Sequence, residues 1–424
     1  MENLSKLGHP KGLYLLFLVE MWERFSFYGM RALIVLYMVQ HLMFSTEKAG
    51  NIYGLYTGLI YLTPLLGGYL ADRFFGQRKC ITTGAILMSI GLFMLASGNN
   101  NLFFIALFFM IAANGFFKSN ISSVLGLLYG DDDSKKDSGY TIFYMGINTG
   151  AFLSPLVCGT IAVKYGYHYG FATAGVGMLI GLLCYKIFEN KLLGKCGLYP
   201  IKTLNNNCSD SEELNEKQRK QLFALLGLLV FTIVFWTCFE QAGSSLTLFA
   251  EYSTNRVIGS YTIPTGYFQS LNPFYIITLA PLITLLWSYL KTKKKEPTSV
   301  EKFTIALGLI SAAYLVMAYA GYLSEISLVS PLWLVLVYLI MTLAELCLSP
   351  IGLSLVSKLA PKKFLSLMMG VWFLTSFIGN TLAGFWGGKY GTISNVALFL
   401  TLAGVSFIAC LILSCLTKKF NKFI

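Results

Sequence analysis

Charged residues are scarce in this chain of 424 residues, because Asp, Glu, Lys and Arg together make up only 12% of it. In soluble domains their share is about 25%. Hydrophobic residues make up 55% of the chain, and the mean hydropathy is +0.64. The one long polar stretch, residues 190–220, is too short for a soluble catalytic or signalling domain. The composition therefore excludes an ordinary soluble protein and indicates one that crosses a membrane several times.

Metal-binding and disulfide patterns are missing as well. The nine cysteines are an odd number without CxxC spacing, and most fall within apolar stretches, where a free cysteine packs as a small apolar side chain. There are only three histidines, and no nucleophile stands in a motif with a base. We therefore expect no enzyme activity, no bound metal and no organic cofactor.

Twelve apolar stretches are each long enough to cross the roughly 30 Å of hydrocarbon in a bilayer as a helix. We therefore predict an all-α membrane protein with twelve transmembrane helices. The stretches are residues 13–43, 49–71, 80–98, 102–128, 140–163, 170–189, 219–250, 266–290, 303–323, 331–357, 364–388 and 394–416.

The net charge of +12 is distributed unevenly around these stretches. With both termini on the inner side, 25 of the 32 Lys and Arg residues fall inside, four fall outside and three lie within spans. Cytoplasmic loops carry such an excess of basic residues. The charge therefore reports topology, with both termini in the cytoplasm. The membrane that we expect is the cytoplasmic (inner) membrane. It does not indicate nucleic-acid binding.

The polar stretch separates six spans from six. We predict an N-terminal six-helix bundle over 1–190, a cytoplasmic linker over 191–218 and a C-terminal six-helix bundle over 219–424. Two bundles joined in this way are typical of transporters that work by alternating access around a site near the middle of the bilayer.

The loop after the second span contains a string of glycines and charges. It reads Gly68-x-x-x-Asp72-Arg73-x-x-Gly76-x-Arg78-Lys79. Asp72 can pair with Arg73 near the inner surface, and Gly76 permits a tight turn that lets the basic pair face the cytoplasm. The string resembles the loop signature of the major facilitator superfamily. That resemblance implies the major facilitator fold and a gating role for Asp72, Arg73 and Arg78.

The first span carries four charges on one side. At the middle of the bilayer each costs between about 2.5 and more than about 10 kcal/mol, so these side chains must face protein or water. Arg24 can hold either Glu20 or Glu23 in a charge-assisted hydrogen bond, and protonation of that glutamate would release it. The cluster predicts a proton switch; the alternative is a static buried ion pair that fixes helix packing. At helical spacing this face presents Glu20, Glu23, Arg24, Phe27, Tyr28 and Arg31.

Three more charges lie within later spans, namely Lys118, Glu240 and Glu345. The spans together contain four acids and three bases, and one bound proton would neutralise that balance of −1. The bases lie in the first six spans, whereas Glu240 and Glu345 lie in the last six. A cavity lined by both halves would be positive on one wall and negative on the other. Such a cavity suits a zwitterion, such as an amino acid or a short peptide.

Further polar and aromatic side chains lie within the spans, as the charged residues do. Asn148 and Asn272 can hydrogen-bond a backbone-like ligand, and contacts between helices are the alternative. Pro350, after Ser349, permits its helix to bend. Aromatic residues that can form apolar pockets, or simply pack, include Tyr28, Tyr61 and Trp372.

Several strings from the first span to the eleventh point to one family. They are Glu20-x-x-Glu23-Arg24, Gly115-Phe116-Phe117-Lys118, Tyr144-x-Gly146-Ile147-Asn148-x-Gly150, Phe239-Glu240-Gln241-x-Gly243-Ser244, Gln269-Ser270-x-Asn272-Pro273 and Glu345-x-x-x-Ser349-Pro350-x-Gly352. Together they resemble the proton-dependent oligopeptide transporters. The chain departs from the family pattern at Phe27, where a second tyrosine is common, and it has no room for the two extra helices of many bacterial relatives.

The resemblance implies a role for each of these residues. It makes Glu20, Glu23 and Arg24 the proton-coupling site and places Glu240 in the proton or gating machinery.

The resemblance also implies how a peptide is held. Arg31 and Lys118 meet its carboxylate, and Asn148, Asn272 and Glu345 hold its amino end. The positions that line the family's pocket are Tyr28, Tyr61, Ser349 and Trp372.

We therefore predict a proton-coupled symporter that imports di- and tripeptides by alternating access. Its partners are the peptide, the proton as coupling ion and the lipid bilayer, and we expect it to work as a monomer. The alternative is the same fold carrying another small solute, such as an amino acid, nitrate or another metabolite. Glu345 argues against a simple anion, because it adds negative charge opposite the bases.

Overall fold

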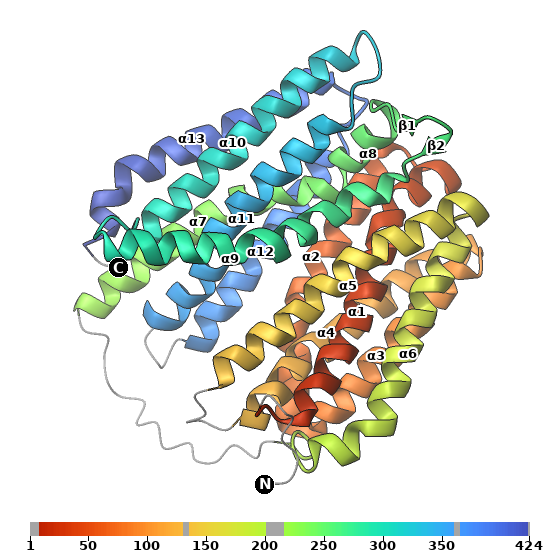
Figure 1. The fold of residues 1–424 in the computed structure, drawn as a ribbon, viewed down its shortest axis with the longest axis vertical. Coiled ribbons are helices and arrows are strands. Elements are labelled where there is room, and N and C mark those ends of the chain that lie inside the picture. The colour runs from red at the N-terminus through yellow and green to blue at the C-terminus, as the bar shows by residue number, and fades with distance from the viewer. Residues whose placement is uncertain (1–7, 130–134, 201–215, 360–364, 423–424) are drawn as a thin grey trace. The chain divides into compact units, whose positions relative to one another are not determined.

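The computed structural model describes residues 8–129, 135–200, 216–359 and 365–422. Long helices account for most of them (Figure 1). The first half contains α1 (Lys11–Leu36), η1 (Tyr37–His41), α2 (Thr46–Leu70), η2 (Ala71–Phe75), α3 (Gln77–Ala96), η3 (Asn100–Leu102), α4 (Phe103–Tyr129), α5 (Lys136–Tyr165) and α6 (Tyr167–Leu193). The second half contains α7 (Glu216–Phe239), η4 (Glu240–Gly243), α8 (Ser245–Tyr252), β1 (Val257–Ile258), β2 (Tyr261–Thr262), η5 (Thr265–Ser270), α9 (Leu271–Thr292), α10 (Ser299–Ser324), α11 (Leu332–Leu359), α12 (Leu365–Gly387) and α13 (Asn395–Phe420).

Ten helical segments in the described part of the chain are long and apolar enough to cross a membrane. One of them, Arg219–Tyr252, contains α7 from Arg219 onward together with η4 and α8, so these three elements form a single span. The other two spans are α1 and α2. Helix α1 contains several charged side chains, and α2 contains many glycine, threonine and tyrosine residues, which sets both apart from the ten. The all-α membrane fold with twelve spans, predicted from the sequence, is confirmed.

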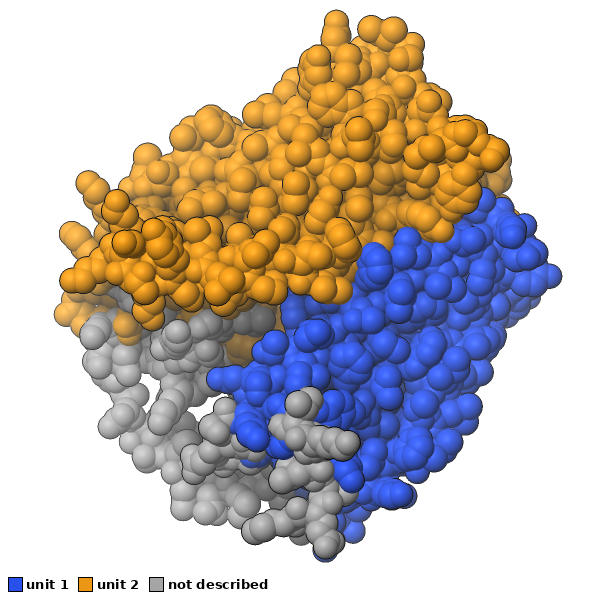
Figure 2. All heavy atoms as spheres, viewed as in Figure 1, with its two compact units in different colours: residues 1–37, 59–209 blue, residues 38–58, 210–424 orange. Residues whose placement is uncertain are grey.

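The chain forms two compact units, one of residues 1–37 with 59–209 and one of residues 38–58 with 210–424 (Figure 2). The sequence predicts one boundary, in the linker, whereas segment 38–58 groups with the second unit. Glycine packing explains this grouping, because a Cβ at Gly54 would lie 2.7 Å from the Cα of Gly384. Glu47 also pairs with Lys389 at 2.9 Å. Residues 201–215 of the predicted linker lie outside the described residues.

In the first unit, α1 packs mainly against α5 and α6, and α3 packs mainly against α4. Two glycines of α5, one turn apart, bring α1 close. A Cβ at Gly146 would lie 2.9 Å from the carbonyl oxygen of Phe17, and Gly150 lies even closer to that of Met21. The glycines of the Tyr144–Gly150 string therefore seat α1 on α5 and fix the rotation of its charged face.

In the second unit, α10 packs against α13 and α11, and α12 packs against α7. Helix α9 is mostly exposed, as expected for a helix that faces lipid. The 3₁₀ turn η4 interrupts the seventh span between α7 and α8. A short antiparallel hairpin, in which Val257 pairs with Thr262, follows α8.

Candidate functional site

Glu20, Glu23 and Arg24 form a buried ion cluster on α1. Nε of Arg24 lies 3.1 Å from Oε1 of Glu20, one turn earlier, and also pairs with Oε2 of Glu23. The three side chains expose 3%, 0% and 5% of their surface. One guanidinium therefore faces two carboxylates in a nearly dry environment. Protonation of either glutamate would leave Arg24 with a single ionised partner, which is the chemistry that a proton switch needs.

The other predicted residues of the first unit form two cation–aromatic pairs. Nζ of Lys118 lies 4.7 Å from the ring centre of Tyr61, and the guanidinium of Arg31 lies 5.7 Å from that of Tyr28. Lys118 is also close enough to act electrostatically on both Glu20 and Glu23. The structure therefore brings the predicted carboxylate-binding lysine next to the predicted proton site. Arg31 follows Arg24 by two turns of the same helix.

Asn148 is buried in α5, and its Nδ2 donates a hydrogen bond to the carbonyl oxygen of Tyr144, one turn earlier, at 3.0 Å. This bond occupies one of its two amide protons and leaves hydrogen-bonding capacity for a ligand.

In the second unit, Asn272 and Glu345 are hydrogen-bonded partners. Nδ2 of Asn272 donates to Oε2 of Glu345 at 2.8 Å and to Oγ1 of Thr342 at 3.1 Å. The structure thus brings together two residues from α9 and α11 that the sequence implicates in binding an amino group. Thr342 was not predicted, although its position one turn before Glu345 places it on the same helix face.

Ser349 and Trp372 also belong to the second unit. Ser349 is half-buried and follows Glu345 by one turn of α11. Trp372 is buried in α12, and its indole lies so close to Gly352 that a Cβ there would overlap the ring. The glycine of the Ser349–Gly352 string therefore makes room for Trp372.

Glu240 is the first residue of η4, the turn that interrupts the seventh span, and only 3% of it is exposed. Its neighbour Gln241 fixes this turn. Nε2 of Gln241 donates to the carbonyl oxygen of Ala383 in α12 at 3.0 Å, and its Oε1 accepts from Ser245 at 2.6 Å. The Phe239–Ser244 string thus encodes a stable break in the helix that presents Glu240.

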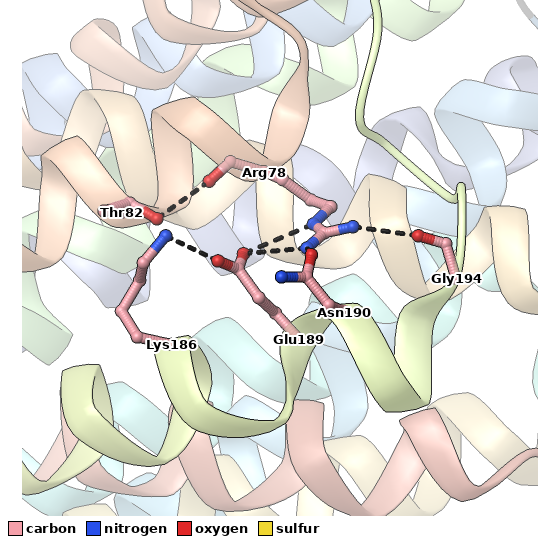
Figure 3. A network of polar contacts seen from close by, with 6 residues as sticks. All are labelled: Arg78, Thr82, Lys186, Glu189, Asn190 and Gly194. Atoms are coloured by element: carbon pink, nitrogen blue, oxygen red, sulfur yellow. Dashed lines mark hydrogen bonds and ion pairs between the residues drawn. The ribbon is translucent and has the colours of Figure 1, made fainter.

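Arg78 is the centre of a polar network at the start of α3 (Figure 3). Nη2 lies 3.2 Å from Oε2 of Glu189 in α6 and donates to Asn190 at 2.5 Å, while Nη1 donates to the carbonyl oxygen of Gly194 at 2.9 Å. Lys186 supplies a second cation to Glu189 at 2.5 Å. The network ties the start of α3 to the end of α6.

The predicted orientation of Arg78 toward the cytoplasm is wrong, because only 3% of it is exposed. Gly76 does make the predicted turn, with a φ of +80° that favours glycine. The turn sends Arg78 into the unit and leaves Lys79 exposed. The carboxylate of Asp72 accepts a hydrogen bond from Gln77 at 2.7 Å, and Arg73 donates one to the hydroxyl of Tyr69 at 2.7 Å. A local sequence pattern does not reveal the distant partner, Glu189.

Twelve spans in two units, a helix break and buried ion pairs are typical of a secondary transporter. Within the described residues, no cluster of His, Cys, Asp and Glu has the form of a metal site. The chain belongs to the POT family, whose model matches residues 78–191 and 186–396.

Several similar proteins are named as peptide transporters. The "Peptide transporter YePEPT" of Yersinia enterocolitica is 36% identical over 90% of this chain and 88% of its own length. The "Di-/tripeptide transporter" of Lactococcus lactis subsp. cremoris is 34% identical over 88% of this chain and 89% of its own. The chain in a crystal structure of a peptide transporter POT in complex with sulfate is 33% identical in sequence to this chain. The match covers 100% of this chain and 97% of that one, with a TM-score of 0.94. The chain therefore has the fold of the POT transporters.

Proposed function

We propose that this protein is a proton-coupled symporter that imports di- and tripeptides by alternating access. The observation that carries the proposal is the buried cluster of Glu20, Glu23 and Arg24, with Lys118 beside it, in a member of the POT family. The relatives named as peptide and di-/tripeptide transporters support the same substrate class.

Proton coupling follows from the electrostatics of the first unit. While Glu20 and Glu23 are both ionised, they hold Arg24 between them. A proton on one glutamate removes one of these attractions and leaves Lys118 with less negative charge nearby. Lys118 is then better able to bind an anionic group, which is the peptide carboxylate in this proposal. Arg31 of α1 supports that contact.

The amino end of the peptide is assigned to the second unit. Glu345 supplies negative charge, and Asn272 holds one of its oxygens. A carboxylate at this position can accept hydrogen bonds from an ammonium group. Glu240, held at the helix break, belongs to the proton or gating machinery in this proposal.

We also propose a location, a topology and an oligomeric state for the protein. The spans lie in the cytoplasmic membrane with both termini in the cytoplasm, because basic residues gather on that side. The protein works as a monomer, with protons as the coupling ion and no bound cofactor. Transport by this scheme breaks no covalent bond of the peptide, so no enzyme activity is proposed.

Ligand binding to the purified protein tests the substrate class. A ligand that binds only the folded state raises the melting temperature in a concentration-dependent way. We expect stabilisation by dialanine and trialanine, and none by alanine or nitrate at the same concentration. Stabilisation by nitrate or alanine alone would favour the alternative, in which the same fold carries another small solute.

A further inference from the structure

Asn114 of α4 is a buried amide that the site described above does not use. None of its surface is exposed, and neither its Oδ1 nor its Nδ2 has a hydrogen-bond partner among the residues that the structure describes. A buried polar group left unpaired costs about 1 to 3 kcal/mol, so proteins rarely contain one without a reason.

Another buried amide of helix α4 does find hydrogen-bond partners. Asn120, on the same helix, is 1% exposed. Its Nδ2 donates to the carbonyl oxygen of Phe116, one turn earlier, at 2.8 Å and to that of Gly67 in α2 at 3.3 Å. Asn114 makes neither kind of bond, so its amide is available to a group beside the helix.

The face of α4 that contains Asn114 points to α1. Phe117 packs against Gly84 of α3, and Gly115 packs against Thr63 of α2. Helical spacing places Asn114 between these two faces, together with Lys118, one turn later. Lys118 acts electrostatically on the glutamates of α1, so the face that it shares with Asn114 is directed to that helix.

The register between α1 and α4 places Asn114 at the depth of Arg24. The two helices run antiparallel: Leu128 lies near Gly12, Tyr129 hydrogen-bonds to His9 just before α1, and Lys118 acts electrostatically on Glu20. Each step of one residue along α1 therefore matches one step back along α4, at the same rise of about 1.5 Å. Four residues from Lys118 toward Asn114 correspond to the four residues from Glu20 to Arg24.

The ion cluster at this depth also has unused hydrogen-bonding capacity. Oε2 of Glu20, Oε1 of Glu23 and Nη2 of Arg24 are buried and have no hydrogen-bond partner among the described residues. Two acceptors and a donor therefore lie at the level of an amide that has both an acceptor and a donor to offer.

We propose that Asn114 is a positioning residue of the proton-coupling cluster and that it reaches the Glu23–Arg24 pair through an internal water molecule. This inference rests on the proton coupling proposed above. A carboxamide suits a position beside an ion cluster because it is uncharged and can both donate and accept hydrogen bonds. Its NH₂ donates toward a carboxylate, and its oxygen accepts from a guanidinium or from a protonated carboxyl. Asn114 can thus serve the cluster both before and after a proton arrives, without a charge of its own.

Among the described residues, the titratable groups around Asn114 are few. Helix α1 contributes Glu20, Glu23 and Arg24, with Tyr28 acting on Arg24 from one turn away. The remaining groups are Lys118 of α4 itself and Tyr61 of α2, beneath Lys118. Helix α3 has no titratable residue after Cys80, and the contacts of α5 with α4 involve Tyr129 and Tyr140 at the other end of α4. A change in pH dependence on substitution of Asn114 would therefore report on the α1 cluster.

The test replaces Asn114 with leucine, which is similar in size and makes no hydrogen bond. In proteoliposomes, we expect Asn114→Leu to lower the initial rate of proton-driven dialanine uptake about tenfold or more, with counterflow exchange changed by less than about twofold. Asn114→Asp places a further acid in the cluster and must be protonated before it can replace the amide. We expect its uptake to recover only in more acidic medium, with the pH profile displaced by about one unit or more.

Asn120→Leu is the matched control, since Asn120 is an equally buried asparagine of the same helix with partners of its own. It should lower the melting temperature without moving the pH profile. If Asn114→Leu keeps the wild-type profile and the wild-type ratio of driven uptake to exchange, the proposal is wrong. It is also wrong if Asn120→Leu moves the profile as far as Asn114→Leu does.

If a variant inserts poorly into liposomes, a binding measurement on the purified protein can replace the uptake assay. The number of protons taken up per dialanine bound can be obtained by calorimetry in buffers of different ionisation enthalpy. We expect this number to fall in detergent-purified Asn114→Leu, and an unchanged number would contradict the proposal. If the wild-type protein itself neither concentrates dialanine nor takes up protons, the proposed function fails first, which is a different result from a failure of Asn114 alone.

Discussion

Glu20 and Glu23 share one guanidinium, and this shared ion pair is the smallest unit of the proposed coupling. Glutamine keeps the size and hydrogen bonding of a protonated glutamate but cannot release a proton. We expect Glu20→Gln and Glu23→Gln each to abolish concentrative dialanine uptake while counterflow exchange continues. Radiolabelled dialanine in proteoliposomes measures both.

Glu47→Gln is the control for these variants, because Glu47 is an exposed acid that pairs with Lys389. It should keep concentrative uptake. If Glu20→Gln and Glu23→Gln both still concentrate dialanine, the cluster is a static ion pair that fixes helix packing.

Arg78 contributes to stability through its buried partner. Removal of its charge leaves Glu189 buried with only Lys186 beside it. We expect Arg78→Met to lower the free energy of unfolding by about 3 kcal/mol, at the low end for a broken buried pair. Thermal unfolding in detergent measures the effect.

Lys79→Met, at the exposed neighbouring position, should change the melting temperature little. A double variant, Arg78→Met with Glu189→Gln, should recover part of the loss, because no buried charge then lacks a partner and Lys186 is half exposed to solvent. Equal melting temperatures for Arg78→Met and the wild type would show that the network in Figure 3 does not stabilise the protein.

At the level of whole helices, glycine contacts hold the charged face of α1 in place. Gly150 of α5 leaves no room for a side chain against the backbone of Met21. We expect Gly150→Val to destabilise the protein by about 1 to 3 kcal/mol, since overpacking displaces α1, and to impair uptake as well.

Gly404 offers a matched control, because a Cβ at this helical position meets nothing within 4 Å. Gly404→Ala should be neutral or slightly stabilising, given the higher helix propensity of alanine. Unchanged stability and uptake in Gly150→Val would mean that the close contact between α1 and α5 is not required.

The spans and the faces of their helices can largely be predicted from the sequence, because hydropathy and helical spacing are local properties. They predict the twelve spans and the shared face of Glu20, Glu23 and Arg24. The rest depends on partners distant in the chain. The burial of Arg78 requires Glu189, and the pairing of Asn272 with Thr342 requires two helices to meet. No local pattern contains such information.

For the molecule as a whole, the division into units shows the same limit. Segment 38–58 continues the first two spans, so the sequence assigns it to the first bundle. It groups with the second unit because Gly54 packs against Gly384 and Glu47 pairs with Lys389. Small residues matched between distant helices cause this grouping, and periodicity alone does not reveal such a match.

The central claim is that a proton gradient drives peptide inward. One charge moved through 100 mV supplies about 2.3 kcal/mol, which is enough for roughly 50-fold accumulation. The most direct test is dialanine uptake into proteoliposomes with an acidic exterior and a negative interior. We expect dialanine to accumulate above the external concentration, and the accumulation to collapse when a protonophore is added. Equal uptake with and without both gradients would contradict it.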